Sequence, residues 1–469
     1  MLAGMAAVVL TTVPAWAVND ALQLNGAHLG AQWAVPFAGL LLSIAVLPLV
    51  AREIWHHHYG KISAAWALLF LVPCAFTYGI QSTVHELMHT VLLEYLPFLI
   101  LLFALFTVAG GVLVKGNLHG SPALNTSILA VGTLIASIAG TTGAAMLLIR
   151  PIIRANDSRL HNAHVIIFFI FLVANIGGSL TPLGDPPLFL GFLKGVSFFW
   201  PARNLLAPML LVVAILLIVF YALDWFLFHI DEHYPPKPDP TPDSRLRIQG
   251  WLNVALLAGI VAAVLLSGVW KPGISLTVNH IEFELQNVVR DVLLLLIAWV
   301  SWRFTRTQIR TGNGFSWEPI VEVAKLFAGI FIAIIPAIAI LRAGTNGALA
   351  PVVRLVTDAN GQPDNTMYFW LTGVLSSFLD NAPTYLVFFN TAGGNAEQLM
   401  GPLGLTLTAI SAGAVFMGAN TYIGNAPNFM VKSIAEERGI KMPSFFGYML
   451  WSLGLLIPCF VVVTWVFFH

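Results

Sequence analysis

Charged side chains are scarce in this sequence. Only 9% of the 469 residues are Asp, Glu, Lys or Arg, and 58% are hydrophobic, whereas a soluble domain carries roughly a quarter charged residues. This composition excludes a water-soluble enzyme. The 22 basic residues balance the 22 acidic ones, so the chain has no overall attraction to nucleic acid. We therefore expect no nucleic-acid partner.

Cysteine is also nearly absent. The two cysteines, Cys74 and Cys459, both lie inside apolar runs. Neither a disulfide framework nor a cysteine zinc site is available to this chain. We expect no redox chemistry and no organic cofactor.

Long apolar segments are what the sequence has instead. At about 20 residues for each crossing of a bilayer, they predict an all-α polytopic membrane protein with ten spans. The expected spans are Trp33–Ala51, Ile62–Gly79, Leu96–Val114, Val165–Trp200, Leu205–Phe228, Trp251–Trp270, Val288–Phe304, Ile320–Leu341, Leu403–Ile434 and Phe445–Phe468.

Two further apolar stretches are interrupted by polar residues. Thr126–Ile149 and Thr366–Thr391 are long enough to cross, but GTTG at Gly140–Gly143 and LDNAP at Leu379–Pro383 break them near their midpoints. Non-helical backbone is tolerated at membrane depth only where protein or a water-filled cavity satisfies it. We therefore predict two re-entrant hairpins that face an internal site.

The N-terminus sets the expected orientation. Residues 1–17 end in Ala15-Trp16-Ala17 and resemble a signal peptide, although no Lys or Arg precedes the apolar part; a short uncleaved helix is the alternative. With residues 1–32 exported, the loops predicted inside hold 16 of the 22 Lys and Arg. Cytoplasmic loops carry such an excess, which predicts a multi-pass protein of the bacterial inner membrane.

The segments follow the same order twice. Residues 33–229 and residues 251–469 each contain five spans and one hairpin, in opposite orientations, and the proline-rich linker at residues 230–250 is predicted in the cytoplasm. The midpoints of the two hairpins are 239 positions apart. Inverted repeats with discontinuous helices are typical of secondary transporters, whose site lies near the bilayer midplane.

One span in each half is broken by glycine and proline. The first break is ANIGGSLTPLGDPP (Ala174–Pro187) and the second is GANTYIGNAPNF (Gly418–Phe429), with Ala174-Asn175 recurring as Ala419-Asn420 at an offset of 245. Glycine permits unusual backbone angles and proline lacks an amide donor, so carbonyls are freed that suit a hard cation. A proline kink in a structural helix is the alternative.

These breaks, the repeat order and the hairpin SSFLDNAPTY (Ser376–Tyr385) resemble the ion transporter superfamily, which includes arsenite, citrate and dicarboxylate carriers. The resemblance is greatest to its NhaD-type sodium/proton antiporters and the related citrate transporter group, and it covers almost the whole chain after Trp33. It implies a homodimer with a static scaffold. It also implies a mobile unit of hairpins and broken spans that moves like an elevator.

The charge in the hairpins and broken spans indicates the sign of the cargo. Two acids, Asp185 and Asp380, and no Lys or Arg occur in the four candidate site segments, which are Thr126–Ile149, Asn175–Leu193, Thr366–Thr391 and Gly404–Val431. A buried carboxylate is costly unless it is paired, protonated or bound to a cation. Each aspartate should therefore hold a sodium ion or a proton. The alternative is a protonated aspartate whose only role is to form a hydrogen bond with the backbone of a helix break.

Polar side chains at the hairpin tips and breaks form the expected site. Asp185 and Asp380 are the expected sodium ligands, and protons arriving from the opposite side would displace the ion. Sodium and protons are then the ligands of an antiporter surrounded by membrane lipid. The full set of expected site residues is Asp380, Asn381, Asp185, Asn175, Thr181, Thr141, Thr142, Ser376, Ser377, Asn420, Thr421 and Asn425.

A sodium-coupled citrate or dicarboxylate carrier is the main alternative. Serine, threonine and asparagine at hairpin tips, together with helix N-termini, can bind anionic groups. An anion would then face Asp380 without a nearby Arg or Lys, unless bound sodium ions screened the repulsion.

A remote alternative is a membrane zinc metallopeptidase. The segment His85-Glu86-Leu87-Met88-His89 matches the HExxH pattern, in which two histidines bind zinc and the glutamate acts as base. No third ligand follows at a convincing distance, so a structural role at the membrane interface is preferred. We also expect Asp224, Arg290 and Asp291, which lie near span ends, to be interfacial.

Overall fold

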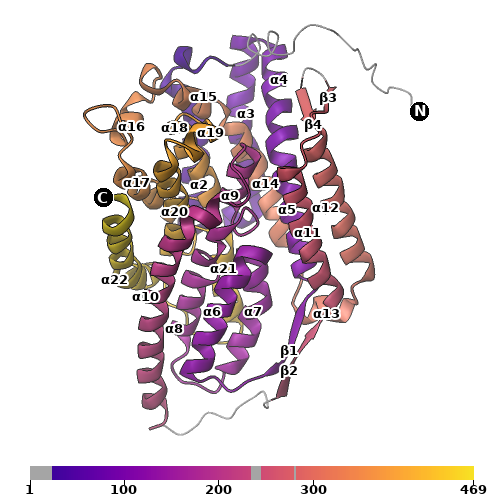
Figure 1. Cartoon of the computed structure of the whole chain (residues 1–469), viewed down its shortest axis with the longest axis vertical. Coiled ribbons are helices and arrows are strands. Elements are labelled where there is room, and N and C mark those ends of the chain that lie inside the picture. Colours follow the sequence, from indigo (N-terminus) through magenta and orange to yellow (C-terminus); the bar gives the residue numbers. More distant parts are fainter. Residues whose placement is uncertain (1–23, 234–243, 279–280) are drawn as a thin grey trace.

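The computed structural model describes residues 24–233, 244–278 and 281–469. The predicted signal peptide and residues 234–243 of the predicted linker lie outside the described residues. Within the described residues, the chain is an elongated bundle of helices with one two-stranded sheet at each end (Figure 1). The prediction of an all-α polytopic membrane protein is confirmed.

The first half of the chain has two paired helices, a third span, a hairpin, a broken span and a long last helix. The third span is α4 and α5, joined by the π-helical turn η3; the hairpin is α6 and α7; and the broken span is α8, η4 and α9. The helices are α2 (Val35–Val50), α3 (Arg52–Tyr78), α4 (Ile80–Thr90), η3 (Val91–Tyr95), α5 (Leu96–Ala109), α6 (Pro122–Ala139), α7 (Thr141–Ala155), α8 (Ala163–Leu172), η4 (Ile176–Leu180), α9 (Pro186–Leu193) and α10 (Trp200–Asp231).

The second half repeats this order. Here α14 and α15 form the third span, α17 and α18 the hairpin, and α20, η6 and α21 the broken span. The helices are α11 (Trp251–Val269), α12 (Leu285–Phe304), α13 (Thr307–Gly312), α14 (Glu318–Ala333), α15 (Ile335–Arg342), α16 (Ala350–Leu355), α17 (Asn365–Phe378), α18 (Asn381–Thr391), α19 (Ala396–Met400), α20 (Gly404–Met417), η6 (Gly418–Asn420), α21 (Ala426–Glu437) and α22 (Phe445–Val463).

Short elements complete the described chain. Strands β1 and β2 pair antiparallel, as do β3 and β4. The described chain also has three short 3-10 helices and a C-terminal π-helical turn, of which η2 and η7 continue the spans of α2 and α22. These elements are β1 (Leu113–Asn117), β2 (Ser244–Gln249), β3 (Ser275–Val278), β4 (Ile281–Glu284), η1 (Gly26–His28), η2 (Ala31–Ala34), η5 (Gly344–Asn346) and η7 (Thr464–Phe468).

The number of spans agrees with the prediction, but some of the segments that count as spans differ from those predicted. Nine helical segments of the described chain are long and apolar enough to cross a bilayer, and the pair α14 and α15, bent by 42°, makes a tenth. Helix α6 is among the nine because it has 18 residues, although it is one limb of a hairpin. The segment Gly404–Asn420, the first limb of the second broken span, is shorter than a span.

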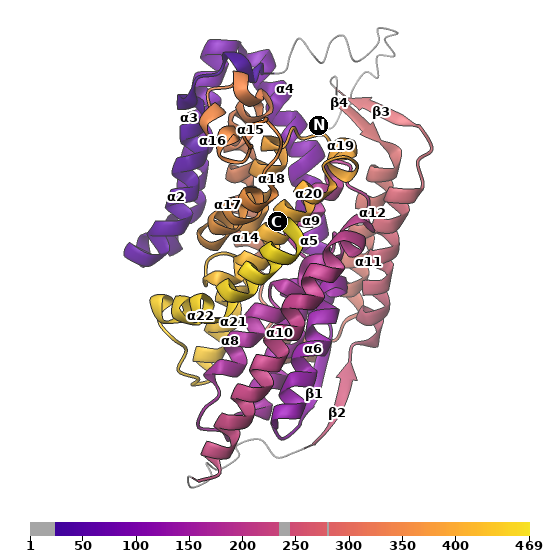
Figure 2. The ribbon, with the colours of Figure 1, turned by 60° about the vertical axis from the view of Figure 1, so that its left-hand side comes forward.

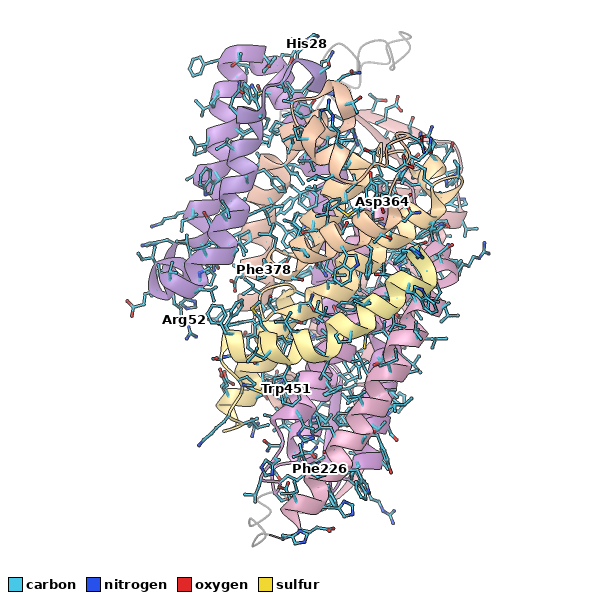
Figure 3. All side chains as sticks on the ribbon, turned by 90° about the vertical axis from the view of Figure 1, so that its left-hand side faces the viewer. His28, Arg52, Phe226, Asp364, Phe378 and Trp451 are labelled. Atoms are coloured by element: carbon cyan, nitrogen blue, oxygen red, sulfur yellow. The ribbon has the colours of Figure 1, made fainter. Side chains whose placement is uncertain are left out.

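The two halves are inverted relative to each other. We call the end near His28 the upper end and the end near Phe226 the lower end (Figure 3). The hairpin of α6 and α7 extends to the lower end, whereas the hairpin of α17 and α18 lies toward the upper end (Figure 1). The pairs α2–α3 and α11–α12 lie on opposite sides of the molecule, with the hairpins and broken spans between them (Figure 2).

Both hairpins turn where the sequence predicts. The first turns at Gly140, whose φ of 78° lies in the region that favours glycine. In the second, α17 ends at Phe378, and the Asp380 side chain accepts the N–H of Ala382 at 3.1 Å as the N-cap of α18. Different local chemistry therefore produces the same reversal in the two halves.

The first limbs of the two broken spans form the centre of the bundle. Every residue from His164 to Leu172 in α8, and from Thr406 to Met417 in α20, is buried. A helix that is apolar on all sides belongs in the interior. The breaks that follow these limbs are therefore held deep inside the protein.

Asp224, which lies near a span end and is expected at the membrane interface, is buried within the protein. Its carboxylate contacts the Arg159 guanidinium at 2.5 Å, His164 Nε2 at 2.8 Å and Asn125 Nδ2 at 2.9 Å. Arg290 is likewise only 1% exposed and pairs with Asp291. Position along a span indicates depth in the membrane, but not whether the side chain points toward protein or lipid.

The Asp224 contacts generate a prediction about stability. Replacing Asp224 with leucine removes the short contact from Arg159, which keeps only its longer one to Asp231 at 3.6 Å, and also removes the acceptor of His164 and Asn125. Breaking a buried ion pair on one side costs roughly 3–5 kcal/mol. We expect a clearly lower thermal unfolding midpoint in detergent. Glu436→Leu is the matched control, since it breaks the exposed Lys432–Glu436 pair and should change the midpoint little. Equal midpoints for both variants would contradict this account.

Candidate functional site

Matching hydrogen bonds define how the two halves correspond. The hydroxyl of Thr181 in the first break donates to the carbonyl of Ser137 in the first hairpin. The hydroxyl of Thr421 in the second break donates to the carbonyl of Ser377 in the second hairpin. Each threonine hydroxyl also accepts the backbone N–H two residues later. Both pairs of equivalent residues are 240 positions apart.

The same offset relates the starts of the helices that follow. Helices α7 and α18 begin 240 positions apart, and so do α9 and α21. Asp185 therefore corresponds to Asn425, and Thr141 corresponds to Asn381. The predicted equivalence of Asn175 with Asn420 at an offset of 245 is wrong, because Asn420 corresponds to Leu180.

Asp185 lies where the hairpin tips and the breaks meet. Its side chain is 1% exposed. It accepts hydrogen bonds from the Thr141 hydroxyl at 3.0 Å and from Asn425 Nδ2 at 3.1 Å, both on Oδ1, and from Asn381 Nδ2 on Oδ2. The three donors come from the two hairpins and from the opposite break. One carboxylate thus joins both halves of the chain.

All three donors to Asp185 are electrically neutral. Among the described residues, no Lys or Arg forms a salt bridge with Asp185 or Asp380. The three hydrogen bonds stabilise a carboxylate at this position without cancelling its charge.

A chain of asparagines extends from Asp185 into the centre. Asn425 Nδ2 also approaches Asn175 Oδ1 at 3.2 Å, and Asn175 Nδ2 donates to Asn428 Oδ1 at 2.7 Å. Asn428 Nδ2 in turn donates to the carbonyls of Gly418 and Thr421, both at 2.9 Å. These bonds satisfy carbonyls that the second break frees from helical pairing.

Sequence reasoning missed two residues of this network. Asn428 lies in the quoted break GNAPNF, and its spacing from Asn425 would have placed both on one face of α21. Ser137 lies 240 positions before Ser377, which was a predicted site residue. Aligning the two halves at the correct offset would therefore have identified Ser137. Its hydroxyl donates to the carbonyl of Gly177 and accepts the N–H of Leu180 at 3.2 Å.

Asp380 lies beside this centre and does not bond Asp185. Its carboxylate caps α18, and the next residue, Asn381, is the one that reaches Asp185. The Oδ1 atom of Asn381 is buried without a hydrogen-bond partner, and so is Oδ1 of Asn420. Buried acceptors are normally satisfied. These two amide oxygens are therefore available to a ligand.

The remaining predicted residues mostly hold the breaks to the hairpins. Ser376 donates to the carbonyl of Ala414 at 2.6 Å, and Ser377 donates to the carbonyls of Gly373 and Met417. Asn420 Nδ2 donates to the Ser377 hydroxyl at 2.9 Å.

A cavity of about 100 Å³ adjoins Asp185. Its polar wall includes Thr141, Thr142 and Asp185, and its other walls come from α5, α14 and the first turn of α21. Helices α7 and α21 run from the site toward the lower end, and the cavity lines the beginnings of both. It therefore lies on the lower side of the carboxylate.

The HExxH residues lie elsewhere, on α4 at the upper end. The rings of His85 and His89 are 6.4 Å apart, and the Glu86 carboxylate accepts the N–H of Leu24 at 2.9 Å. No group of three or more His, Cys, Asp or Glu in the described chain could hold a metal ion. This arrangement gives no support to a zinc peptidase centre.

Comparison with known proteins points to transport. Residues 26–468 match the model of a family described as "Putative citrate transport". Two curated proteins, named as uncharacterized transporters of Mycobacterium bovis and Mycobacterium tuberculosis, are each 23% identical to this chain over 404 residues. Each match covers 85% of this chain and 84% of the relative. These names indicate a transporter and not an enzyme.

The tight packing of the breaks generates a prediction. A Cβ on Gly184 would lie 2.1 Å from the carbonyl oxygen of Gly178, and because this neighbour is backbone it cannot move aside cheaply. We expect Gly184→Ala to destabilise the protein by roughly 1–3 kcal/mol or more, measured as the unfolding midpoint in detergent. In Gly454→Ala the new Cβ meets nothing within 4 Å, so this control should keep its midpoint. A Gly184→Ala midpoint equal to the control would show that the breaks tolerate more volume.

Proposed function

Since the chain belongs to the family described as "Putative citrate transport", we propose that it is a secondary active transporter that exchanges sodium for protons at Asp185. The observation that carries this proposal is a carboxylate that is 1% exposed, with three neutral donors and no salt bridge among the described residues. A carboxylate in such surroundings requires a cation or a proton.

The oxygen atoms around Asp185 suit a sodium ion. Hard cations take carboxylate and carbonyl oxygens as ligands. Asp185 supplies the carboxylate, and the unpartnered Oδ1 atoms of Asn381 and Asn420 supply amide oxygens. Asp380, which adjoins Asn381, adds a second negative charge to the region. Sodium, as the cargo, would draw its ligands from these residues and from freed carbonyls of the breaks.

Exchange follows from competition for one carboxylate. A proton and a sodium ion cannot both neutralise Asp185, so arrival of one favours release of the other. Reorientation of the hairpins and broken spans, an elevator-type movement, would then carry either cation across. A homodimeric scaffold would stay fixed during this movement. The excess of Lys and Arg on the loops predicted inside supports an orientation with the lower end in the cytoplasm of a bacterial cell.

Sodium-coupled citrate or dicarboxylate transport is the second candidate, and the family description favours it. Such a cargo would place carboxylates near Asp185 and Asp380. Like charges at short range in a low-dielectric interior repel strongly. Because neither aspartate forms a salt bridge among the described residues, bound sodium ions would have to screen the anion.

The test is transport by variants that remove each charge. Asp185→Asn and Asp380→Asn should each reduce sodium uptake into everted vesicles, driven by a pH gradient, to the level of empty vesicles. Asparagine is as good an N-cap as aspartate, so Asp380→Asn keeps the helix cap and loses only the charge. Asp364→Asn is the matched control, since Asp364 caps α17 outside the site and should transport normally.

The same vesicles distinguish the two cargoes. Uptake of radiolabelled citrate or succinate that requires sodium, together with absent sodium/proton exchange, would replace the first candidate by the second. Wild-type sodium exchange by Asp185→Asn would remove this residue from the mechanism.

A further inference from the structure

A second cavity, of about 330 Å³, lies at the upper end. Its walls come from α4, η3, α14 and α15, from the residue that follows α9, and from the segment that precedes α2. Unlike the cavity beside Asp185, it is lined by charged side chains of both signs, among them Glu94, Lys194 and Arg342. It lies where the third span of each half meets the hairpins and broken spans.

An ion pair crosses this boundary. Glu94 Oε1 and Lys194 Nζ are 2.5 Å apart, and their side chains are 13% and 15% exposed. Glu94 lies on η3 in the third span of the first half. Lys194 directly follows α9, the helix that begins at Asp185. The pair therefore ties the helix that carries the site to a neighbouring span.

A second polar contact crosses the same boundary in the other half. Arg342 Nε, at the end of α15, donates to Asn390 Oδ1 at 2.8 Å. Asn390 lies on α18, the hairpin helix that begins at Asn381. In both halves, then, the third span is joined at the upper end to an element that forms the site.

Both third spans depart from regular helix beside these contacts. Glu94 lies on a π-helical turn, and such turns often occur at functional positions because the extra residue re-aims side chains. The other third span bends by 42° between α14 and α15. The π-helical turn carries Glu94, and Arg342 lies at the far end of the helix that follows the bend.

The lower side differs. The smaller cavity reaches Asp185 from that side, and α6, α7, α8 and α10 extend below α13 (Figure 1). These first-half elements thus extend past the second half at the lower end, whereas the two polar contacts described above join the third spans to α18 and to the residue after α9 at the upper end.

We infer that this is the conformation closed at the upper end, and that the Glu94–Lys194 pair is the latch that holds it closed. This inference rests on the proposed function, in which the hairpins and broken spans move relative to the third spans. Movement of α9 by more than a few ångströms separates the two charges. Because both are partly exposed, water can solvate them after separation, so the latch can open.

Accessibility of a cysteine tests the latch without any transported cargo. Ile334 lines the upper cavity and is 1% exposed, so Ile334→Cys should react slowly with a membrane-impermeant maleimide added to the upper side. Adding Lys194→Met should raise this rate by up to roughly fivefold, the upper limit expected for loss of one partly exposed ion pair. Cys74 and Cys459 are buried, and protein without Ile334→Cys gives the background.

Two further variants separate a latch from a general loss of structure. Glu94→Lys with Lys194→Glu restores the pair in reverse and should return the rate toward that of Ile334→Cys alone. Lys432→Met breaks an exposed pair within α21 and should leave the rate unchanged. Equal rates with and without Lys194→Met, or an increase that charge reversal does not correct, would overturn the inference. If labelling behaves as expected but sodium exchange is absent, the latch stands and the proposed cargo is wrong.

Discussion

The structure depends on one buried carboxylate that three distant segments hold without neutralising it. Asp185 accepts hydrogen bonds from Thr141, Asn381 and Asn425, and the last two lie 196 and 240 positions away. These contacts bring the two hairpin tips and the two breaks to one point. They also explain why the interior contains so much irregular backbone, since freed carbonyls and amides need partners that only such a meeting point supplies.

The two halves share a backbone plan but not their chemistry. At an offset of 240, Asp185 corresponds to Asn425 and Thr141 corresponds to Asn381. The threonine that bonds the hairpin carbonyl is the same in both halves, so the backbone geometry is conserved within the chain. The Asp185 carboxylate is replaced by Asn425 in the second half, and Asp380 of the second half corresponds to Gly140 in the first. Each half therefore contributes one carboxylate, at a different position of the shared frame, and only Asp185 lies where the hairpin tips and the breaks meet.

The sequence was enough to predict the hairpins, the breaks and their order, because glycine and proline interrupt helices by local physics. Gly140 permits the positive φ of the first hairpin turn without steric cost, whatever surrounds it. The residues that bond Asp185 were predicted as parts of the site, but the sequence did not predict which of them contact it. The contact with Asn381, for example, depends on how α18 packs against α9. Asp224 and Arg290 show the same limit. Both lie near span ends, yet packing turns them inward. The sequence also suggested the wrong offset between the two halves, because the dipeptide Ala-Asn recurs 245 positions later whereas the structurally equivalent residues are 240 positions apart.

Neutral donors are what make such a site suitable for exchange. An arginine beside Asp185 would form a lasting ion pair, and removing one partner from a buried pair costs roughly 3–5 kcal/mol, so cations would compete poorly. Hydroxyl and amide donors stabilise the carboxylate less, and they leave its net charge in place. The remaining attraction acts on any small cation that reaches the cavity. A site of this kind binds through charge, and it can release its cargo because its own hydrogen bonds persist when the cation leaves.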